Sequence, residues 1–243
     1  MLKDAGAPVT TVGHRGHRGQ PPPEAHEGYA AGRATKELLI TTAQRLFAER
    51  GIDAVSLREV ATTAGTRNTA AAQYYFGDKE ALVLAIFRRH TADITARRLV
   101  LLERAVHAAD PLRATVEAIV SPLADQLDGN GFLIFLARCQ SDHVRYDGVL
   151  GADVNGSFLR ARQELRHLLP DLPDGLFRRR FDLVTKLVVT ALAGVQWRAV
   201  KSGHGSHDVE AIVVDLVDIA CGMLLAPSSR PPSPRRKAPH DRA

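Results

Sequence analysis

The chain has few cysteines, few aromatic residues and no long hydrophobic run. Its 243 residues contain two cysteines, and 5% of them are aromatic. Two cysteines give no disulfide framework in a chain of this length, so free thiols in a reducing cytoplasm are the simplest account. The longest apolar stretch, around residues 187–195, is far shorter than the roughly 18 residues of a membrane helix, and no apolar export segment opens the chain. We therefore expect a cytoplasmic protein with no membrane partner.

Little net charge remains outside the C-terminal tail. The formal charge is +5, but residues 227–243 hold five basic side chains against one aspartate. The rest of the chain therefore carries about +1, and its overall charge does not by itself indicate nucleic-acid binding. Residues 1–32 are rich in Gly, Pro and His and show no helical or strand period. We predict that 1–32 and 227–243 are disordered tails.

Catalytic and metal-binding patterns are also scarce. Cys139 and His143 are four residues apart, so on a helix they would share a face as a thiol and base or as half a metal site. No further ligand or orienting acid occurs at a recognisable spacing, and there is no Gly-rich phosphate loop. We predict no catalytic residue, no metal and no cofactor, with Cys139 as a buried thiol beside a surface histidine.

Two helices are predicted ahead of the most informative segment. Apolar residues recur at i, i+4, i+7 and i+8 over 39–47, and Gly51 ends that helix. Ser56 and Glu59 form a Ser-x-x-Glu capping box, in which each side chain satisfies an orphan backbone N–H at the start of a second helix. Gly65 supplies the backbone freedom to leave it. About one residue of turn then remains before a third helix.

The segment that follows Gly65 is too polar for an ordinary core helix. It presents guanidinium, amide and hydroxyl groups where an apolar stripe would stand, and the alanines at 70–72 keep it thin. A thin helix can enter the roughly 12 Å major groove, where Arg, Asn and Gln reach base edges or phosphates. Tyrosine hydroxyls reach the phosphate backbone while their rings pack on the preceding helix. The residues predicted to contact DNA are Ser56, Thr66, Arg67, Asn68, Thr69, Gln73, Tyr74, Tyr75 and Lys79.

The end of this segment closes the small domain. Phe76 is predicted to turn inward, and Asp78 to cap a new helix. Lys79 then stands in the first turn of that helix, where a phosphate would lie near the helix N-terminus. Residues 33–80 are therefore predicted to form a helix-turn-helix DNA-binding domain.

Together these features resemble the DNA-binding domain of the TetR family of bacterial regulators. That family has a phenylalanine near the end of its first helix, here Phe47, and an Ala-Gly turn, here 64–65. A tyrosine-rich recognition helix and a Phe-x-x-Lys-x-x-Leu close follow, here 73–76 and 76–82. The whole set extends over some fifty residues, which makes the resemblance far more specific than any single member.

One spacing departs from the commonest pattern of that family. Gly65 and Phe76 are eleven positions apart, one more than is usual, and the chain is similar to a subset with Arg-Asn-Thr after the turn and Gln-Tyr before the aromatic close. Contact with bases is therefore assigned to a set of four side chains: Arg67, Asn68, Thr69 and Gln73.

Beyond residue 80 the sequence predicts successive helices, including 174–201 and 209–225, and it has few strand signals. The predicted fold class is all-α, with residues 81–226 forming a ligand-binding and dimerisation domain after the DNA-binding domain. A wide apolar stripe marks the last two helices, and an intrachain core explains part of it. The resemblance implies a four-helix bundle with a second copy. The residues assigned to that interface are Leu187, Val195, Val209, Ile212, Val213, Leu216, Ala220 and Met223.

A homodimer would place two recognition helices about 34–36 Å apart, suited to a palindromic double-stranded operator. The resemblance further implies a repressor released by a small-molecule effector through linkage. Candidate walls of the effector site are Phe132, Phe135, Arg138, Phe158 and Trp197, with ordinary core packing as the alternative for each. A helical protein-interaction module without DNA readout is the other interpretation of the whole chain.

Overall fold

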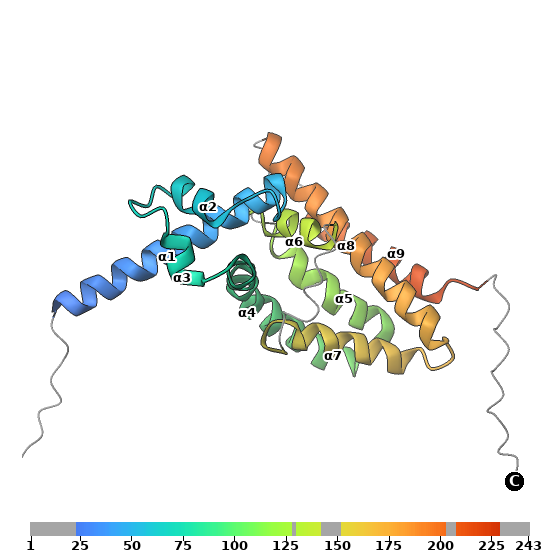
Figure 1. Cartoon of the computed structure of the whole chain (residues 1–243). Helices are drawn as coiled ribbons and strands as arrows, with labels where there is room; N and C mark the ends of the chain where they lie inside the picture. The colour runs from blue at the N-terminus through green and yellow to red at the C-terminus, as the bar shows by residue number, and fades with distance from the viewer. Residues whose placement is uncertain (1–22, 128–129, 142–151, 203–207, 229–243) are drawn as a thin grey trace, which may run out of the picture.

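A computed structural model of the protein describes residues 23–127, 130–141, 152–202 and 208–228 (Figure 1). Within these ranges every regular element is an α-helix, which confirms the predicted all-α class. The helices are α1 (Pro23–Arg50), α2 (Leu57–Thr63), α3 (Ala71–Phe76), α4 (Lys79–Ala105), α5 (Pro111–Ala124), α6 (Phe132–Ser141), α7 (Ala152–Leu168), α8 (Asp174–Ser202) and α9 (Val209–Leu225).

Local capping signals set several of the helix starts. A serine or aspartate precedes each of α2, α4, α5 and α9, and its side-chain oxygen accepts a hydrogen bond from the backbone N–H three residues later. Such caps satisfy donors that have no partner inside the helix. The four capping residues are Ser56, Asp78, Asp110 and Asp208.

The first helix begins earlier than the sequence suggested. The predicted tail 1–32 overlaps α1, which starts at Pro23, so the prediction is wrong for residues 23–32. Proline is well suited to a first helical position because its missing N–H would have no partner there, and the alanines and glutamates that follow are good helix formers. Residues 1–22 and 229–243 lie outside the described part of the chain.

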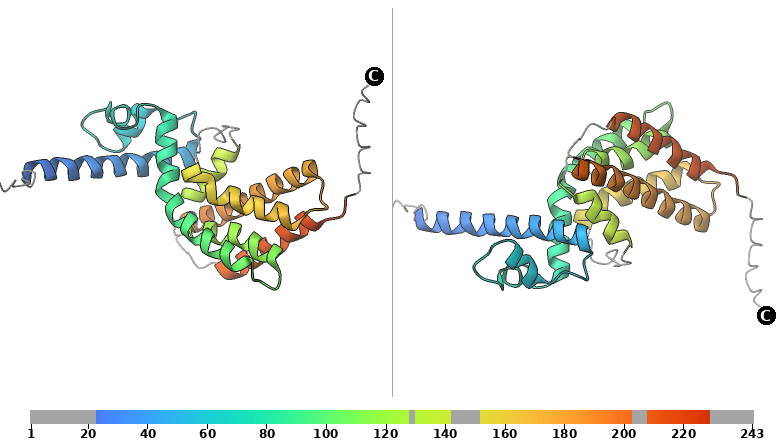
Figure 2. Two further views of the ribbon diagram at one scale, coloured as in Figure 1. Left: turned by 90° about the horizontal axis from the view of Figure 1, so that it is seen from below. Right: turned by 90° about the horizontal axis from the view of Figure 1, so that it is seen from above.

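The helices form a head and a body that share α4. The head consists of α1, α2 and α3 with the first turns of α4 (Figures 1 and 2). In the body α5 and α7 pack on the rest of α4, and α8 and α9 pack on α6 and α5, respectively. The predicted domain boundary at residue 80 falls in the first turn of α4, which runs without interruption to Ala105. The two parts are therefore connected by a helix rather than by a linker.

An aromatic cluster packs the head against the body. Phe47 of α1, Phe87 of α4 and Phe135 of α6 are buried, with ring centroids 5.4 Å apart for Phe87–Phe135 and 6.4 Å for Phe47–Phe135. Phe132 adds a further ring, stacked on His90 at 4.1 Å. Burial of such rings supplies both apolar area and ring-to-ring contact.

Amide side chains, of which Gln44 and Gln196 are buried, cross the same junction. The ring nitrogens of His90 lie 2.8 Å from Gln44 Oε1 and 3.0 Å from Gln126 Oε1. Gln196, fully buried on α8, donates to the Gln126 carbonyl at 2.8 Å. Its Oε1 accepts from the N–H groups of Leu133 and Ile134, so it also caps the start of α6. We call Gln44, His90, Gln126 and Gln196 the junction network.

Among the described helices, α8 has the length and apolar composition of a membrane span. It packs on α6 and on α9, and its most apolar 18-residue window, of mean hydropathy 1.3, is 39% buried. A core helix of a helical body has the same properties, so this feature does not identify a membrane segment.

The junction network predicts a large effect for Gln196→Leu. The substitution leaves two N–H groups of α6 and the Gln126 carbonyl without their partner, and each buried unpaired group costs about 1–3 kcal/mol. We expect the free energy of unfolding in urea to fall by at least about 2 kcal/mol. The control is Gln163→Leu at an exposed position of α7, for which a change within about 0.5 kcal/mol is expected. Equal effects would contradict this role.

Candidate nucleic-acid interface

The turn between α2 and α3 is longer than predicted. Gly65, with φ of +69°, does leave α2, but α3 begins only at Ala71, so Arg67, Asn68 and Thr69 lie in the turn and not on a helix. The Thr66 hydroxyl donates to the carbonyls of Ala61 at 2.8 Å and Asn68 at 2.9 Å. These bonds help to order the turn, which comprises residues 64–70.

Asn68 has a structural role within the turn. Its Oδ1 accepts from the Ala70 N–H at 2.9 Å, and its own carbonyl accepts from the Ala71 N–H at 3.0 Å. An asparagine that bonds the backbone two residues on stabilises a turn in this way. The side chain is exposed, so its amide NH₂ faces outward while Oδ1 is occupied.

The recognition helix α3 is short, and its alanines serve a different purpose from the one expected. Ala71 and Ala72 are buried against the head, so small side chains here allow close packing rather than a thin outer face. The outer face is made by Gln73 and Tyr74, both exposed. The Gln73 amide donates to the Gly77 carbonyl at the end of the same helix.

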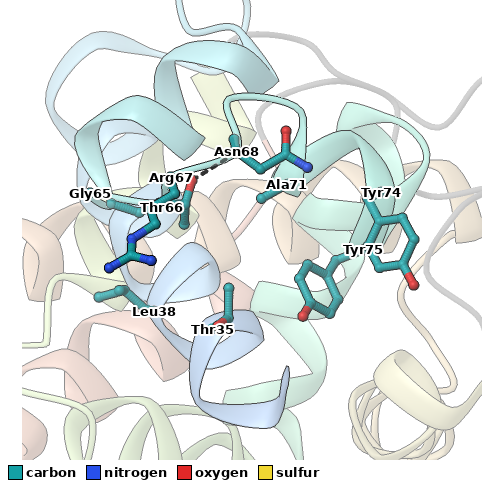
Figure 3. A pocket seen from close by; sticks show the side chains of 10 residues that line it. Thr35, Leu38, Gly65, Thr66, Arg67, Asn68, Ala71, Tyr74 and Tyr75 are labelled. Carbon is teal, nitrogen blue, oxygen red and sulfur yellow. Dashed lines mark hydrogen bonds between the residues drawn. The ribbon is translucent and has the colours of Figure 1, made fainter. Parts of the chain in front are cut away.

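The two tyrosines project from α3 side by side (Figure 3). Tyr74 is 80% exposed, so its ring does not pack on the preceding helix as predicted. It meets the edge of the Tyr75 ring, with centroids 5.2 Å apart and an interplanar angle of 82°. Tyr75 is half-buried beside α1. Tyr74 therefore presents its ring and hydroxyl to solvent, whereas the Tyr75 hydroxyl lies near Gly32 of α1.

A shallow groove lies where α1 meets the turn and α3 (Figure 3). Thr66, Arg67, Asn68, Tyr74 and Tyr75 line it together with Thr35 and Leu38 of α1, so the structure brings five of the nine predicted residues to one surface. Thr35 and Leu38 were not predicted. Thr35 is half-buried and Leu38 is 48% exposed, and nothing in their sequence context separates them from ordinary surface residues.

Lys79 and Ser56 have roles inside the head. The Lys79 ammonium donates to the carbonyls of Ile52 at 2.9 Å and Asp53 at 3.3 Å, which fixes the start of α4 against the link after α1. Ser56 caps α2 as predicted, with the Glu59 N–H at 3.1 Å. The other half of the predicted capping box is wrong, because the Glu59 carboxylate forms an ion pair with Arg50 instead.

Three exposed cations of the head form no ion pair within the part of the chain that the structure describes. They are Lys36 on α1, Arg58 on α2 and Arg67 in the turn. The Lys36 ammonium lies 5.7 Å from the centroid of the half-buried Phe76 ring. Cations without a carboxylate partner remain available to phosphates.

The residues predicted to line an effector site occupy separate places. Phe132 and Phe135 belong to the aromatic cluster at the junction, and exposed Arg138 donates to the Ala48 carbonyl at 3.4 Å. Phe158 packs on Phe181 at 5.4 Å in the body. Trp197 is 40% exposed on α8, with the Lys201 ammonium 4.8 Å from its ring. They do not form one wall.

The residues predicted to form the dimer interface differ in their burial. Three are buried in the chain's own core and are not accessible to a second copy: Val195, Leu216 and Ala220. Of the remaining five, Val209 is exposed and four are half-buried: Leu187, Ile212, Val213 and Met223. Large apolar side chains that the prediction omitted are exposed on the same two helices, among them Leu183, Trp197 and Ile219.

The alternative thiol–base pair is placed only in part. Cys139 is buried on α6, as expected for a core thiol, and His143 lies outside the described residues. In the described ranges no three His, Cys, Asp or Glu side chains come together as a possible metal site.

Arg67→Met and Lys79→Met separate a contact with DNA from a contact within the head. Arg67 is exposed, so its replacement should leave stability unchanged and lower the slope of log binding constant against log salt by about 0.9, the value for one phosphate contact. Lys79→Met removes two hydrogen bonds and should lower the free energy of unfolding by about 1 kcal/mol. Titrations of duplex DNA at several salt concentrations and urea unfolding measure both; the reverse pattern would contradict the assignment.

Comparison with known proteins agrees with this geometry. Residues 39–86 match the family model of bacterial regulatory proteins of the tetR family, and residues 113–223 match a tetracyclin repressor-like C-terminal domain. The chain is 26% identical over 215 residues to the HTH-type transcriptional repressor KstR2 of Rhodococcus jostii (strain RHA1), covering 85% of this chain and 98% of that protein.

A solved structure shares the fold. The fatty acid degradation regulator FadR from Bacillus halodurans superposes with a TM-score of 0.50 at 16% identity, covering 76% of this chain and 97% of that one. The two family models cover most of the head and most of the body, and the helix-turn-helix geometry and all-α architecture agree with them. The chain belongs to the TetR family of bacterial DNA-binding transcriptional regulators.

Proposed function

We propose that the protein is a homodimeric repressor that binds a palindromic operator and releases it when a small molecule binds the body. The observation that carries the DNA-binding part is the exposed polar and aromatic surface of the turn and α3, supported from behind by buried alanines. The similarity to a repressor over most of both chains supports the direction of control. The site of action of such a regulator is the cytoplasm.

Each head offers groups for both phosphates and bases. The Tyr74 and Tyr75 hydroxyls and the free cations suit phosphate oxygens. The outward amide of Asn68, Thr69 and Gln73 suit base edges in the major groove, because their donors and acceptors match the base-pair pattern there. Arg67 was predicted to belong to the same set, but it lies in the turn with no ion pair among the described residues, and we assign it to a phosphate. The Gln73 amide must exchange its bond with the Gly77 carbonyl for one with a base.

Dimerisation is supported by an apolar surface of α8 and α9, which pack against each other in the body (Figure 2). Leu183, Trp197 and Ile219 are 56%, 40% and 49% exposed. Half-buried Leu187 and Met223 extend this apolar surface. Large exposed apolar patches are characteristic of interaction sites. A second copy is the occupant we propose, because two heads are needed to read two half-sites.

Ligand release is supported by the way the head is attached. A ligand that favours one arrangement of the body helices also favours one placement of α4, and with it one placement of the head. Reciprocal linkage then requires that DNA and ligand weaken each other's binding by the same factor. No observation supports the alternative of an interaction module without DNA readout. Such a module would have no use for the polar surface of the turn and α3, and that surface is present and exposed.

The dimer proposal is tested by Ile219→Arg. A charge placed in an apolar interface without a partner is costly, so we expect the variant to have half the molar mass of the wild type in light scattering and to lose operator binding by at least about tenfold. Val106→Arg is the control, since Val106 is 64% exposed beyond the end of α4 and should leave mass and binding unchanged. A dimeric Ile219→Arg would remove α9 from the interface.

Sequence readout is tested by comparing Tyr74→Ala with Gln73→Ala. Loss of a phosphate contact should weaken binding to specific and random duplexes by the same factor, whereas loss of a base contact should cost about 1–3 kcal/mol on the specific duplex only. Both side chains are exposed, so neither change should affect folding. Equal losses on both duplexes for both variants would contradict base reading by α3.

A further inference from the structure

A charged side chain is buried in the middle of the body. Arg98 of α4 is 4% exposed and lies between α5 and α7. Its Nε donates to the Ala118 carbonyl of α5 at 3.2 Å, and its Nη1 donates to the Ser157 hydroxyl of α7 at 3.1 Å. The guanidinium carbon is 5.8 Å from the centroid of the Phe158 ring. All three partners are electrically neutral.

The charge of Arg98 has no carboxylate partner among the described residues. Several arginines at the surface do have one: for example, Arg113 pairs with Asp218, and Arg166 pairs with Asp174. This is the reverse of what stability alone favours, since exposed ion pairs contribute little and a buried uncompensated charge is costly. Burial lowers the pKa of Arg98 to about 10, which leaves the guanidinium charged at neutral pH.

A second polar group accompanies the guanidinium. The Ser157 hydroxyl, itself buried, lies 3.2 Å from the Thr95 hydroxyl one turn before Arg98. The surroundings are otherwise apolar, with buried Ile94 one turn away on α4 and buried Ala161 one turn away on α7. Thr95 and Phe158 are only half-buried, so the contact between α4 and α7 reaches the surface within one layer of side chains.

We propose that Arg98, with the hydroxyls of Ser157 and Thr95, binds the carboxylate of an apolar organic acid that acts as the effector. This inference rests on the ligand-released function proposed above and names its ligand class. A carboxylate matches the guanidinium in charge, accepts two N–H bonds from it and leaves no net charge buried. A phosphate dianion would leave one negative charge uncompensated at the same place. The apolar neighbours of Arg98 suit a hydrocarbon body.

Binding at Arg98 would act directly on the head. The acid enters between α4 and α7, so the two helices must separate there to admit it. Because α4 continues into the head without a break, a change in its position at Arg98 changes the placement of the recognition segment. The sequence carries a signal for this residue: Arg98 follows Ile94 and precedes Leu102 at four-residue steps, within the buried stripe of α4.

The experiment uses the full chain and matched pairs of probes. Straight-chain acids from hexanoate to dodecanoate, phenylacetate and phenylbutyrate are each compared with their primary amide, by thermal unfolding and by calorimetric titration. We expect at least one acid to raise the unfolding midpoint and its amide to bind at least about tenfold more weakly, because the charge-assisted bonds are lost. Equal binding of acid and amide, or no binding by any acid, would overturn the proposal.

Two variants test whether the acid binds at Arg98. Arg98→Met should fold at least as stably as the wild type, since it removes a buried uncompensated charge, and should lose the preference for the acid. Arg97→Met is the control: Arg97 lies next to it in α4 with an exposed side chain 3.6 Å from Asp125, and it should keep the preference. An unchanged preference in Arg98→Met would overturn the assignment, as would its failure to fold.

The outcomes separate this inference from the proposed function. If an amide binds the protein and causes it to release DNA while the matching acid does neither, ligand release is supported and the carboxylate site is refuted. If an acid binds at Arg98 but the protein selects no DNA sequence, the carboxylate site is supported and sequence-specific operator binding is refuted.

Discussion

The continuity of α4 is the constraint on which the rest of the structure depends. This helix contributes its first turn to the head and its middle to the junction, and in the body it packs on α5 and α7. Lys79 holds its start against the carbonyls of Ile52 and Asp53, and His90 connects it through two glutamines to α1 and α5. One helix and its hydrogen bonds therefore connect the head to the body, so a shift of α4 in the body would be transmitted to the head.

Buried polar groups give this connection its geometry. Aromatic burial between α1, α4 and α6 stabilises the junction but tolerates small shifts, because apolar contact has no preferred direction. The junction network is directional: Gln196 is fully buried, and its amide has a donor and two acceptor bonds to satisfy. A network of this kind favours a single arrangement of α1, α4, α6 and α8 when all of its members are bonded.

Much of the fold could be predicted from local signals, since helix caps and glycine positions act over three or four residues. The start of α2 directly after Ser56 followed from its capping signal, and the bounds of α9 followed from its apolar period. The turn before α3 could not be predicted, because the Thr66 and Asn68 side chains bond the backbone of the turn and delay the helix to Ala71. The burial of Val195, Leu216 and Ala220 within the chain could not be predicted either. An apolar stripe on a helix packs equally well against the same chain or against a second copy. The role of Lys79 depended on a carbonyl 27 residues away.

Selection of bound duplexes from a random pool by the full chain tests the central claim most directly. The selection is run at low salt and again at about 0.2 M salt, where purely electrostatic binding is suppressed. The account predicts that the same motif is enriched at both concentrations and that it consists of two inverted half-sites spaced by about one helical turn or a multiple of it. Enrichment that disappears at the higher salt, or a pool that remains random, would contradict a sequence-specific dimeric regulator.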